Sequence, residues 1–234
     1  MPIRRPPLVN KEIYHVIIRA VGDTLIFKDE SDYYRGIFSI YEFNNTMAVV
    51  MRERRKARLK EKQALGKSFF DVRDLFVEIL AFCFMPNHIH LLLKQLKDGG
   101  ISNFIRKLGA GEVGYSNKKY NRKGPLFAKF RAVHIKDDNQ LNTVFAYIHS
   151  NPISLIEPGW KEIGIKNAGE AEKFLENYKW SSYQDYIGKK NFPSVIKKDF
   201  LSETLGGEAD CREIVKNWIE YKKNIENYHE LFLE

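Results

Sequence analysis

The sequence predicts an α+β fold in which an antiparallel sheet carries helices that pack largely on one of its faces. Four segments have the apolar, β-branched or aromatic composition of strands: 12–21, 76–86, 88–94 and 124–135. Three segments have the caps or the apolar spacing of helices: 29–47, 99–120 and 137–152. Strands and helices alternate along the chain, as this packing requires.

The first strand, 12–21, is followed by a turn and a helix. Residues 24–29 read as a short strand or a loop after the turn at Gly22 and Asp23. The segment 29–47 then begins with an Asp/Ser cap and carries aromatic and aliphatic residues at near-helical spacing, which predicts a helix. The next segment, 52–67, favours helix by composition but has few apolar residues. It is therefore either a solvated helix or a mobile arm.

Two apolar runs, 76–86 and 88–94, predict a pair of strands with a hinge at Pro86 and Asn87. We expect both strands in the centre of the sheet. Side chains alternate faces along a strand, so His88 and His90 would point to the same face and Ile89 to the other.

The second half of the chain predicts a helix, a strand and a helix. The helix is expected to begin at Ser102 as N-cap, although three glycines lower the helix propensity of its middle. A strand follows the turn at Gly124 and Pro125. An i, i+3, i+4, i+7 apolar stripe in 137–152 predicts the last helix, which Pro152 ends at Asn151. Tyr147 and Asn151 then lie one turn apart, beside this stripe.

The positive charge is concentrated in two windows. The chain has a net charge of +8 and a pI near 9.3. Residues 52–67 carry eight basic and two acidic side chains, and residues 102–136 carry nine basic and one acidic. The remainder is therefore acidic on balance, so the positive charge that would fit a nucleic-acid partner is concentrated in these two windows. For 52–67, a solvated face with no partner is the alternative.

The two cysteines and the apolar runs bear on the compartment. Cys83 and Cys211 are far apart in the sequence, which argues against a disulfide framework and for a reducing environment. The first ten residues lack the apolar core of a signal peptide, and the longest apolar run, 79–85, is too short to span a bilayer. These features predict a cytoplasmic protein with no membrane partner.

An isolated His-x-His pair is a weak signal, because most such pairs are ordinary polar side chains. Here it occurs within a series of longer strings. The strings "YHVIIRA", "CFMPNHIHLLLK", "GPLFAKFRA", "YIHSNP" and "WSSY" occur in this order between residues 13 and 188. In this they resemble the REP-associated tyrosine transposases, which are relatives of the insertion-sequence single-strand transposases with an HUH motif and one catalytic tyrosine.

The resemblance implies a fold and a domain plan. The fold would be ferredoxin-like, with helices mainly on one face of the antiparallel sheet. Residues 1–188 would form the catalytic domain, with 52–67 as a basic insertion, and residues 189–234 an acidic helical C-terminal extension.

The resemblance also implies a site. His88 and His90 match the histidines that hold a divalent cation, Mg²⁺ or Mn²⁺. Tyr147 matches the tyrosine that attacks a DNA phosphate, and Asn151 takes the place of an amide that completes the metal shell. Two imidazoles leave coordination positions open for a phosphate oxygen and water, as a catalytic metal site requires. His15 and His149 are expected to be structural or to support these ligands.

The partner would be single-stranded or hairpin DNA, cleaved through a 5′-phosphotyrosine. Basic residues mixed with aromatic ones suit phosphates and stacked bases. Eight of them flank the proposed site: Arg106, Lys107, Lys118, Lys119, Arg122, Lys123, Lys129 and Arg131. Two alternatives stay open, a hairpin-binding protein without turnover and a metal phosphoesterase that uses water. The sequence leaves monomer and homodimer equally open.

Overall fold

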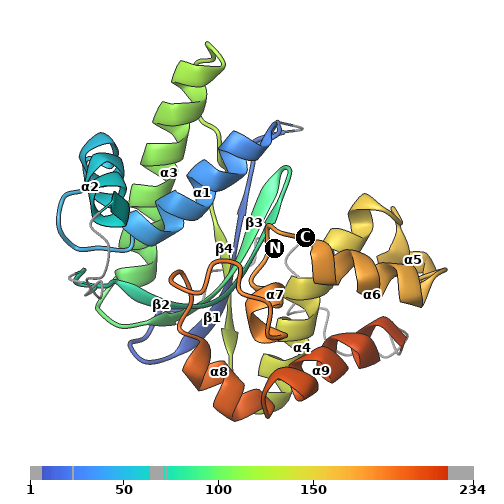
Figure 1. Ribbon diagram of the computed structural model, residues 1–234. Coiled ribbons are helices and arrows are strands. Elements are labelled where there is room, and N and C mark those ends of the chain that lie inside the picture. The colour runs from blue at the N-terminus through green and yellow to red at the C-terminus, as the bar shows by residue number, and fades with distance from the viewer. Residues whose placement is uncertain (1–6, 23, 64–70, 72, 221–234) are drawn as a thin grey trace.

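A four-stranded antiparallel sheet forms the centre of the protein, in the order β2-β3-β1-β4 (Figure 1). The computed structural model describes residues 7–22, 24–63, 71 and 73–220. The strands are β1 (Ile13–Arg19), β2 (Val77–Met85), β3 (His88–Gln95) and β4 (Arg131–Ile135). With α1 (Glu30–Glu42) between β1 and β2, and α3 (Gly100–Lys119) between β3 and β4, the order confirms the predicted ferredoxin-like α+β fold.

The helices α1 and α3 pack on one face of the sheet. Asp29 caps α1, because its carboxylate accepts a hydrogen bond from the Asp32 amide. The helix then approaches the sheet closely at Gly36, where an added Cβ would lie 2.5 Å from the ring of Phe84. Glycine is therefore required for this contact between α1 and β2.

The start of α3 differs from the expectation that Ser102 is its N-cap. The helix begins at Gly100, and its N-cap is Gly99, which has a φ of 64°. The side-chain oxygen of Gln95 accepts a hydrogen bond from the Ile101 amide and so caps the first turn instead of a serine. The three glycines of the middle do not interrupt the helix, which continues to Lys119.

The hairpin at Pro86 and Asn87 joins β2 and β3 as predicted, but only β3 is central. β2 is an edge strand, contrary to expectation. Its outer edge is covered by the segment 180–182. The Phe84 amide donates to the Trp180 carbonyl, and the Ser182 amide donates to the Phe82 carbonyl. This cover explains why β2 is apolar enough to suggest a central strand.

The other face of the sheet carries α4 (Asp138–Ser150), which begins at the cap Asp137. The chain then continues into the 3₁₀ helix η1 (Asn151–Leu155), so Pro152 changes the type of helix and does not end it.

Five further helices follow η1 and complete the described chain: α5 (Trp160–Ile163), α6 (Ala168–Asn177), α7 (Tyr183–Tyr186), α8 (Lys198–Leu205) and α9 (Glu208–Glu220). α9 packs against α4 (Figure 1) and buries Cys211, Val215 and Ile219. The helical character of the predicted extension is thus confirmed over α8 and α9, and residues 221–234 lie outside the described part.

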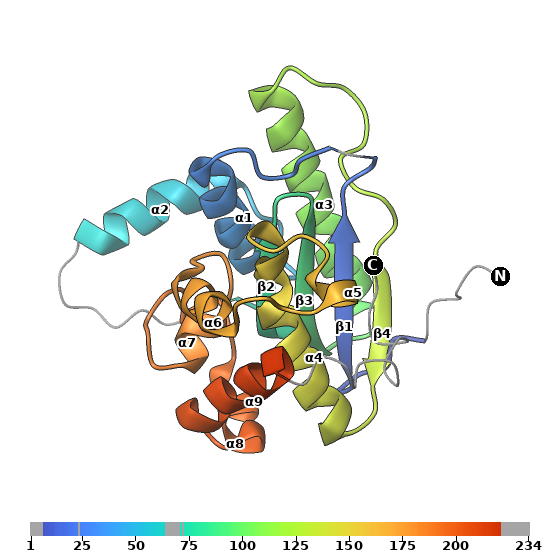
Figure 2. The ribbon, with the colours of Figure 1, turned by 90° about the vertical axis from the view of Figure 1, so that its right-hand side faces the viewer.

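The predicted basic insertion forms α2 (Met51–Gln63), which projects beside α1 (Figure 2). It is fixed to α1 by Glu42, whose buried carboxylate accepts hydrogen bonds from Arg54 at 2.6 Å and Arg58 at 3.0 Å. Residues 64–67 of the insertion lie outside the described residues. Among the helices that the structure describes, none is both long and apolar enough to cross a membrane.

Candidate active site

Strands β1 and β3 bring three histidines together on the face that α4 covers. The register pairs Arg19 with His88, Ile17 with His90 and His15 with Leu92. Directly paired residues share a face in an antiparallel sheet, so the alternation predicted from the sequence holds. His15 and His90 are 0% exposed, and His88 is 8% exposed.

Each of the two His-x-His imidazoles uses its Nδ1 atom for a neighbouring side chain. His88 Nδ1 lies 2.7 Å from Asn87 Oδ1, and His90 Nδ1 lies 3.1 Å from His15 Nε2. The Nε2 atoms of His88 and His90 are buried and have no hydrogen-bond partner among the described residues. Buried polar atoms are nearly always paired, so these two nitrogens are candidates to bind a ligand.

Both imidazoles are neutral at physiological pH. Burial lowers the pKa of His88 to about 3, with smaller contributions from the positive charges of Arg19 and Lys161. Burial also lowers the pKa of His90 well below its usual value. A neutral imidazole has the free lone pair that a metal ligand needs.

Tyr147 lies over this pair of histidines. Its ring is edge-on to His90, with 5.6 Å between ring centroids, and 5.8 Å from the ring of His15. The tyrosine is only 2% exposed, and burial raises its pKa well above the usual value. The structure thus brings together the tyrosine and the histidines predicted from the sequence.

Lys161, in the short helix α5, is a site residue that the sequence analysis missed. Its Nζ atom lies 3.4 Å from the phenol oxygen of Tyr147 and 3.1 Å from Oδ1 of Asn151. Asn151 in turn donates from Nδ2 to the carbonyl of Tyr147 at 2.8 Å. No motif marks Lys161, because it comes from an irregular region ten or more residues after Tyr147 and Asn151.

A cleft of about 390 Å³ opens beside these residues. His88, Asn151 and Lys161 line it, together with Arg19 from β1 and Glu162 from α5. Arg19 and Lys161 outweigh the single negative charge of Glu162, so the cleft beside His88 is positive on balance and suited to a phosphate group.

The donor atoms suit a cation for which the protein supplies only some of the ligands. Among the described residues, no group of three or more His, Cys, Asp or Glu side chains is arranged to hold a metal ion. The two unpaired Nε2 atoms point instead to a site with few protein ligands and open positions. The amide oxygen of Asn151 is engaged by Lys161, so it would join such a site only after leaving that hydrogen bond.

His149 has a structural position, as expected. Its Nε2 atom lies 2.9 Å from the Ser182 hydroxyl, which itself accepts a hydrogen bond from the Phe82 amide. The pair therefore joins the tyrosine helix α4 to the outer edge of β2.

The eight predicted DNA-contacting residues fall into two groups. Lys107 donates to the backbone carbonyls of Asn45 and Met47, and Lys119 donates to Asp29 and Asp32. These two lysines hold the protein's own loops together. The others lie on α3, in the turn after it, and in or just before β4: Arg106, Lys118, Arg122, Lys123, Lys129 and Arg131. Among them, Arg122 also donates to the side chain of Asn117 and to the carbonyl of Pro125.

Comparison with known proteins supports the expected family. Residues 39–151 match the family described as "Transposase IS200 like". This range contains both His-x-His residues, Tyr147 and Asn151. The proteins of this family are transposases, which act on DNA. The chain is similar to this family over 113 of its 234 residues, which confirms the resemblance found in the sequence.

Two kinds of solved structure resemble the chain at low identity. One is a REP-associated tyrosine transposase bound to a REP hairpin, with a TM-score of 0.45, 14% identity, and coverage of 85% of this chain and 93% of that one. Another is a bacterial tRNA(His) guanylyltransferase-like protein with GTP, with a TM-score of 0.38, 12% identity, and coverage of 65% and 69%. These scores are low, and the likenesses carry no functional argument. No match was found among curated proteins.

Proposed function

We propose that this transposase nicks and rejoins single-stranded or hairpin DNA through a covalent bond between Tyr147 and a 5′-phosphate. The observation that carries the proposal is the position of the Tyr147 ring, 5.6 Å from His90, whose outer nitrogen is buried without a partner. The hairpin substrate is proposed from the resemblance of the sequence strings, and we place the reaction in the cytoplasm.

The bond changes are those of a phosphoryl transfer. The phenol oxygen of Tyr147 attacks the phosphorus, the bond from phosphorus to the 3′-oxygen breaks, and the phenolic proton is lost. The products are a 5′-phosphotyrosine and a 3′-hydroxyl, which takes up a proton. Because one phosphodiester, between Tyr147 and the 5′-phosphate, replaces another, the step can be reversed by another 3′-hydroxyl without a nucleotide cofactor.

Lys161 is the residue best placed to assist Tyr147. An unperturbed phenol, with a pKa near ~10, costs roughly 4 kcal/mol to ionise at neutral pH, and burial adds to this cost. An ammonium group 3.4 Å from the phenol oxygen favours the phenolate and offsets part of that cost. The same ammonium group can also stabilise the negative charge that develops on the phosphate.

His88 and His90 would hold Mg²⁺ or Mn²⁺ through their Nε2 atoms, and a bound cation would supply Lewis-acid polarisation of the phosphate. Asn87 and His15 would keep these imidazoles in the metal-binding tautomer, because each engages the opposite ring nitrogen. Nitrogen ligands favour Mn²⁺ over Mg²⁺. The role of Asn151 would be to position Lys161 or, once released, to contribute an oxygen ligand.

One observation favours the second candidate, a hairpin-binding protein without turnover. Tyr147 is 2% exposed, so a DNA phosphate can reach its oxygen only if the covering residues move. In a binding protein they would not need to move.

The deciding experiment is a search for the covalent adduct. A labelled hairpin oligonucleotide with single-stranded flanks is incubated with the protein and Mn²⁺ and run on a denaturing gel. We expect a protein-DNA band with the wild type and none with Tyr147→Phe, which should bind the hairpin within about twofold of wild type. An adduct that persists in Tyr147→Phe would remove Tyr147 from the mechanism. Cleavage without any adduct would favour water as the nucleophile, and binding without cleavage would favour the second candidate.

A further inference from the structure

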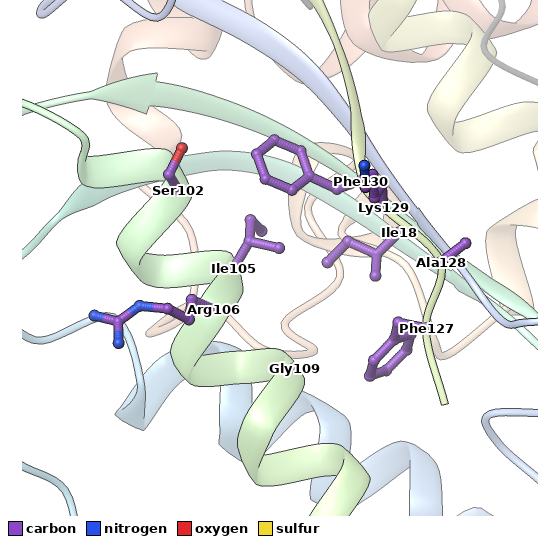
Figure 3. Close-up of a pocket in the computed structure, with 9 residues that line it drawn as sticks. All are labelled: Ile18, Ser102, Ile105, Arg106, Gly109, Phe127, Ala128, Lys129 and Phe130. Atoms are coloured by element: carbon purple, nitrogen blue, oxygen red, sulfur yellow. The ribbon is translucent and has the colours of Figure 1, made fainter. Parts of the chain in front are cut away.

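A second pocket, drawn in Figure 3, includes Ile18 in its lining and therefore lies on the opposite face of the sheet from the histidines. It has a volume of about 250 Å³ and lies between α3 and the segment 127–130 that leads into β4. Ile18 of β1 contributes to its floor. Ile18 and Arg19 are consecutive residues of one strand, so their side chains point to opposite faces, Ile18 into this pocket and Arg19 into the cleft beside His88.

The lining of this pocket is apolar and aromatic. Ile18 and Ile105 are buried, and the half-buried rings of Phe127 and Phe130 stand apart on the side opposite α3 (Figure 3). The two charged residues in the lining are both basic, Arg106 and Lys129. The guanidinium of Arg106 extends away from the cavity in Figure 3, so it leaves the apolar space open.

Gly109 keeps the α3 side of the pocket open. It is helical, and a Cβ added there would lie 3.9 Å from the ring of Phe127, in ordinary van der Waals contact. A larger side chain at this position would therefore occupy the cavity. Gly114, one and a half turns further along α3, has nothing within 4 Å of an added Cβ.

We infer that this pocket binds one unpaired nucleobase of the DNA on which the protein acts. The inference rests on the proposed function and extends it by assigning a recognition site away from the histidines. The cavity is smaller than the about 300–1,000 Å³ that encloses a drug-sized ligand, so it suits a single flat group. Rings and basic side chains without a carboxylate are the surface that stacked bases and phosphates need.

The position of the pocket suggests the path of the strand. β4 is an edge of the sheet, and the segment 127–130 continues that edge, since the Ala128 amide donates to the Arg19 carbonyl. Arg131, paired with Ile17, lies on the histidine face. A DNA strand that passes around this edge would place a base against Phe127 on one face and a phosphate near Arg19 on the other.

The test compares Gly109→Leu with Gly114→Leu, because both place the same residue in one helix and only the first fills the pocket. Neither should lower the melting temperature, since leucine favours helix over glycine. With a fluorescent hairpin that carries single-stranded flanks, we expect Gly109→Leu to weaken binding about five- to 150-fold, the range for loss of one stacked base. Gly114→Leu should bind as wild type does, and Phe127→Ala should weaken binding as Gly109→Leu does.

Abasic substitution in the flanks identifies the base. We expect one position at which removal of the base weakens binding to wild type but has no effect on Gly109→Leu, because the pocket is already filled. Equal affinity of wild type and Gly109→Leu, in a protein that still forms the Tyr147 adduct, overturns this inference and leaves the proposed function standing. The inference is also overturned if every abasic substitution weakens the binding of Gly109→Leu as much as it weakens the binding of wild type. If wild type binds no hairpin, both the inference and the proposed function fail.

Discussion

The Nε2 atom of His15 lies 3.1 Å from the Nδ1 atom of His90. This contact leaves the other nitrogen of His90 directed to the site. A structural or supporting role was predicted for His15 from the sequence. Replacement of His15 by Phe keeps a flat ring and removes the hydrogen bond. We expect the Mn²⁺ concentration for half-maximal cleavage to rise about 10- to 100-fold, the usual effect of losing a residue that orients a ligand.

The matched control for His15 is His134→Phe. His134 lies on the same sheet but pairs with Glu12 at the surface, so its replacement should leave the Mn²⁺ dependence unchanged. Equal effects of the two substitutions would show that the contact between His15 and His90 does not matter for the metal.

Lys161 should matter for chemistry more than for binding. In Lys161→Met, we expect the rate of adduct formation to fall about 10²-fold, as when one electrostatic group at a reacting oxygen is lost. The rise of the rate with pH should move to higher pH, because the phenol loses its neighbouring cation. Lys161→Arg should recover part of the rate. An unchanged pH profile in Lys161→Met would place Lys161 outside the reaction.

Neighbouring lysines on α3 should behave differently. Both lysines are exposed, but Lys119 pairs with the buried Asp32, and no ion pair is found for Lys118 within the described part of the chain. We expect Lys118→Ala to reduce the slope of log affinity for DNA against log salt by about 0.7–0.9, the value for one phosphate contact, with unchanged stability. Lys119→Ala should lower the free energy of unfolding by about 1 kcal/mol and leave the slope unchanged. The reverse pattern would contradict this assignment.

Glu42 should control the attachment of α2. Its buried carboxylate is neutralised by Arg54 and Arg58, and Glu42→Gln would remove the negative charge that both arginines share. Both arginines are partly exposed, so we expect a loss of about 1–3 kcal/mol in the free energy of unfolding, below the value for a fully buried pair. Hydrogen exchange should become faster in 51–63. Glu53→Gln, at an exposed position of α2, is the control and should change neither measurement.

Stability should fall in mild acid because of buried neutral histidines. Burial lowers the pKa of His149 to about 3, whereas an unfolded histidine has a pKa near ~6.5. The contribution of His149 is therefore complete above pH ~6.5 and is lost as the pH falls toward ~3, at about 1.4 kcal/mol per pH unit. Urea unfolding of wild type and His149→Phe at pH 7 and pH 5 checks this. The free energy of unfolding should depend less steeply on pH in the variant, by the amount expected for one proton fewer taken up on unfolding. An identical pH dependence in both proteins would show that His149 does not titrate on unfolding.

Local pattern was sufficient for much of the fold and for part of the site. The strand alternation around His88 and His90 and the apolar stripe of α4 are local properties, and both were predicted correctly. The start of α3 was missed because the cap comes from Gln95, a side chain outside the helix. The edge position of β2 was missed because its cover, 180–182, is about a hundred residues away.

Contacts between residues far apart in the sequence also explain which features of the site were not predicted. The approach of Lys161 to Tyr147 depends on how the chain turns after η1, which no spacing rule gives. The structural use of Lys119 depends on Asp29 and Asp32 in another helix. A count of basic residues cannot separate lysines of this kind from those that face a ligand.

The segment 180–182 also has a consequence for the solution behaviour of the protein. By occupying the open hydrogen-bonding groups of β2, it removes a template on which strands of other molecules could assemble. A shortened chain that ends before this segment would keep the histidines and Tyr147 but would present a bare apolar strand. Such a fragment should be prone to fibrous aggregation. The region after α6 therefore protects the sheet that carries the site from aggregation through its β2 edge.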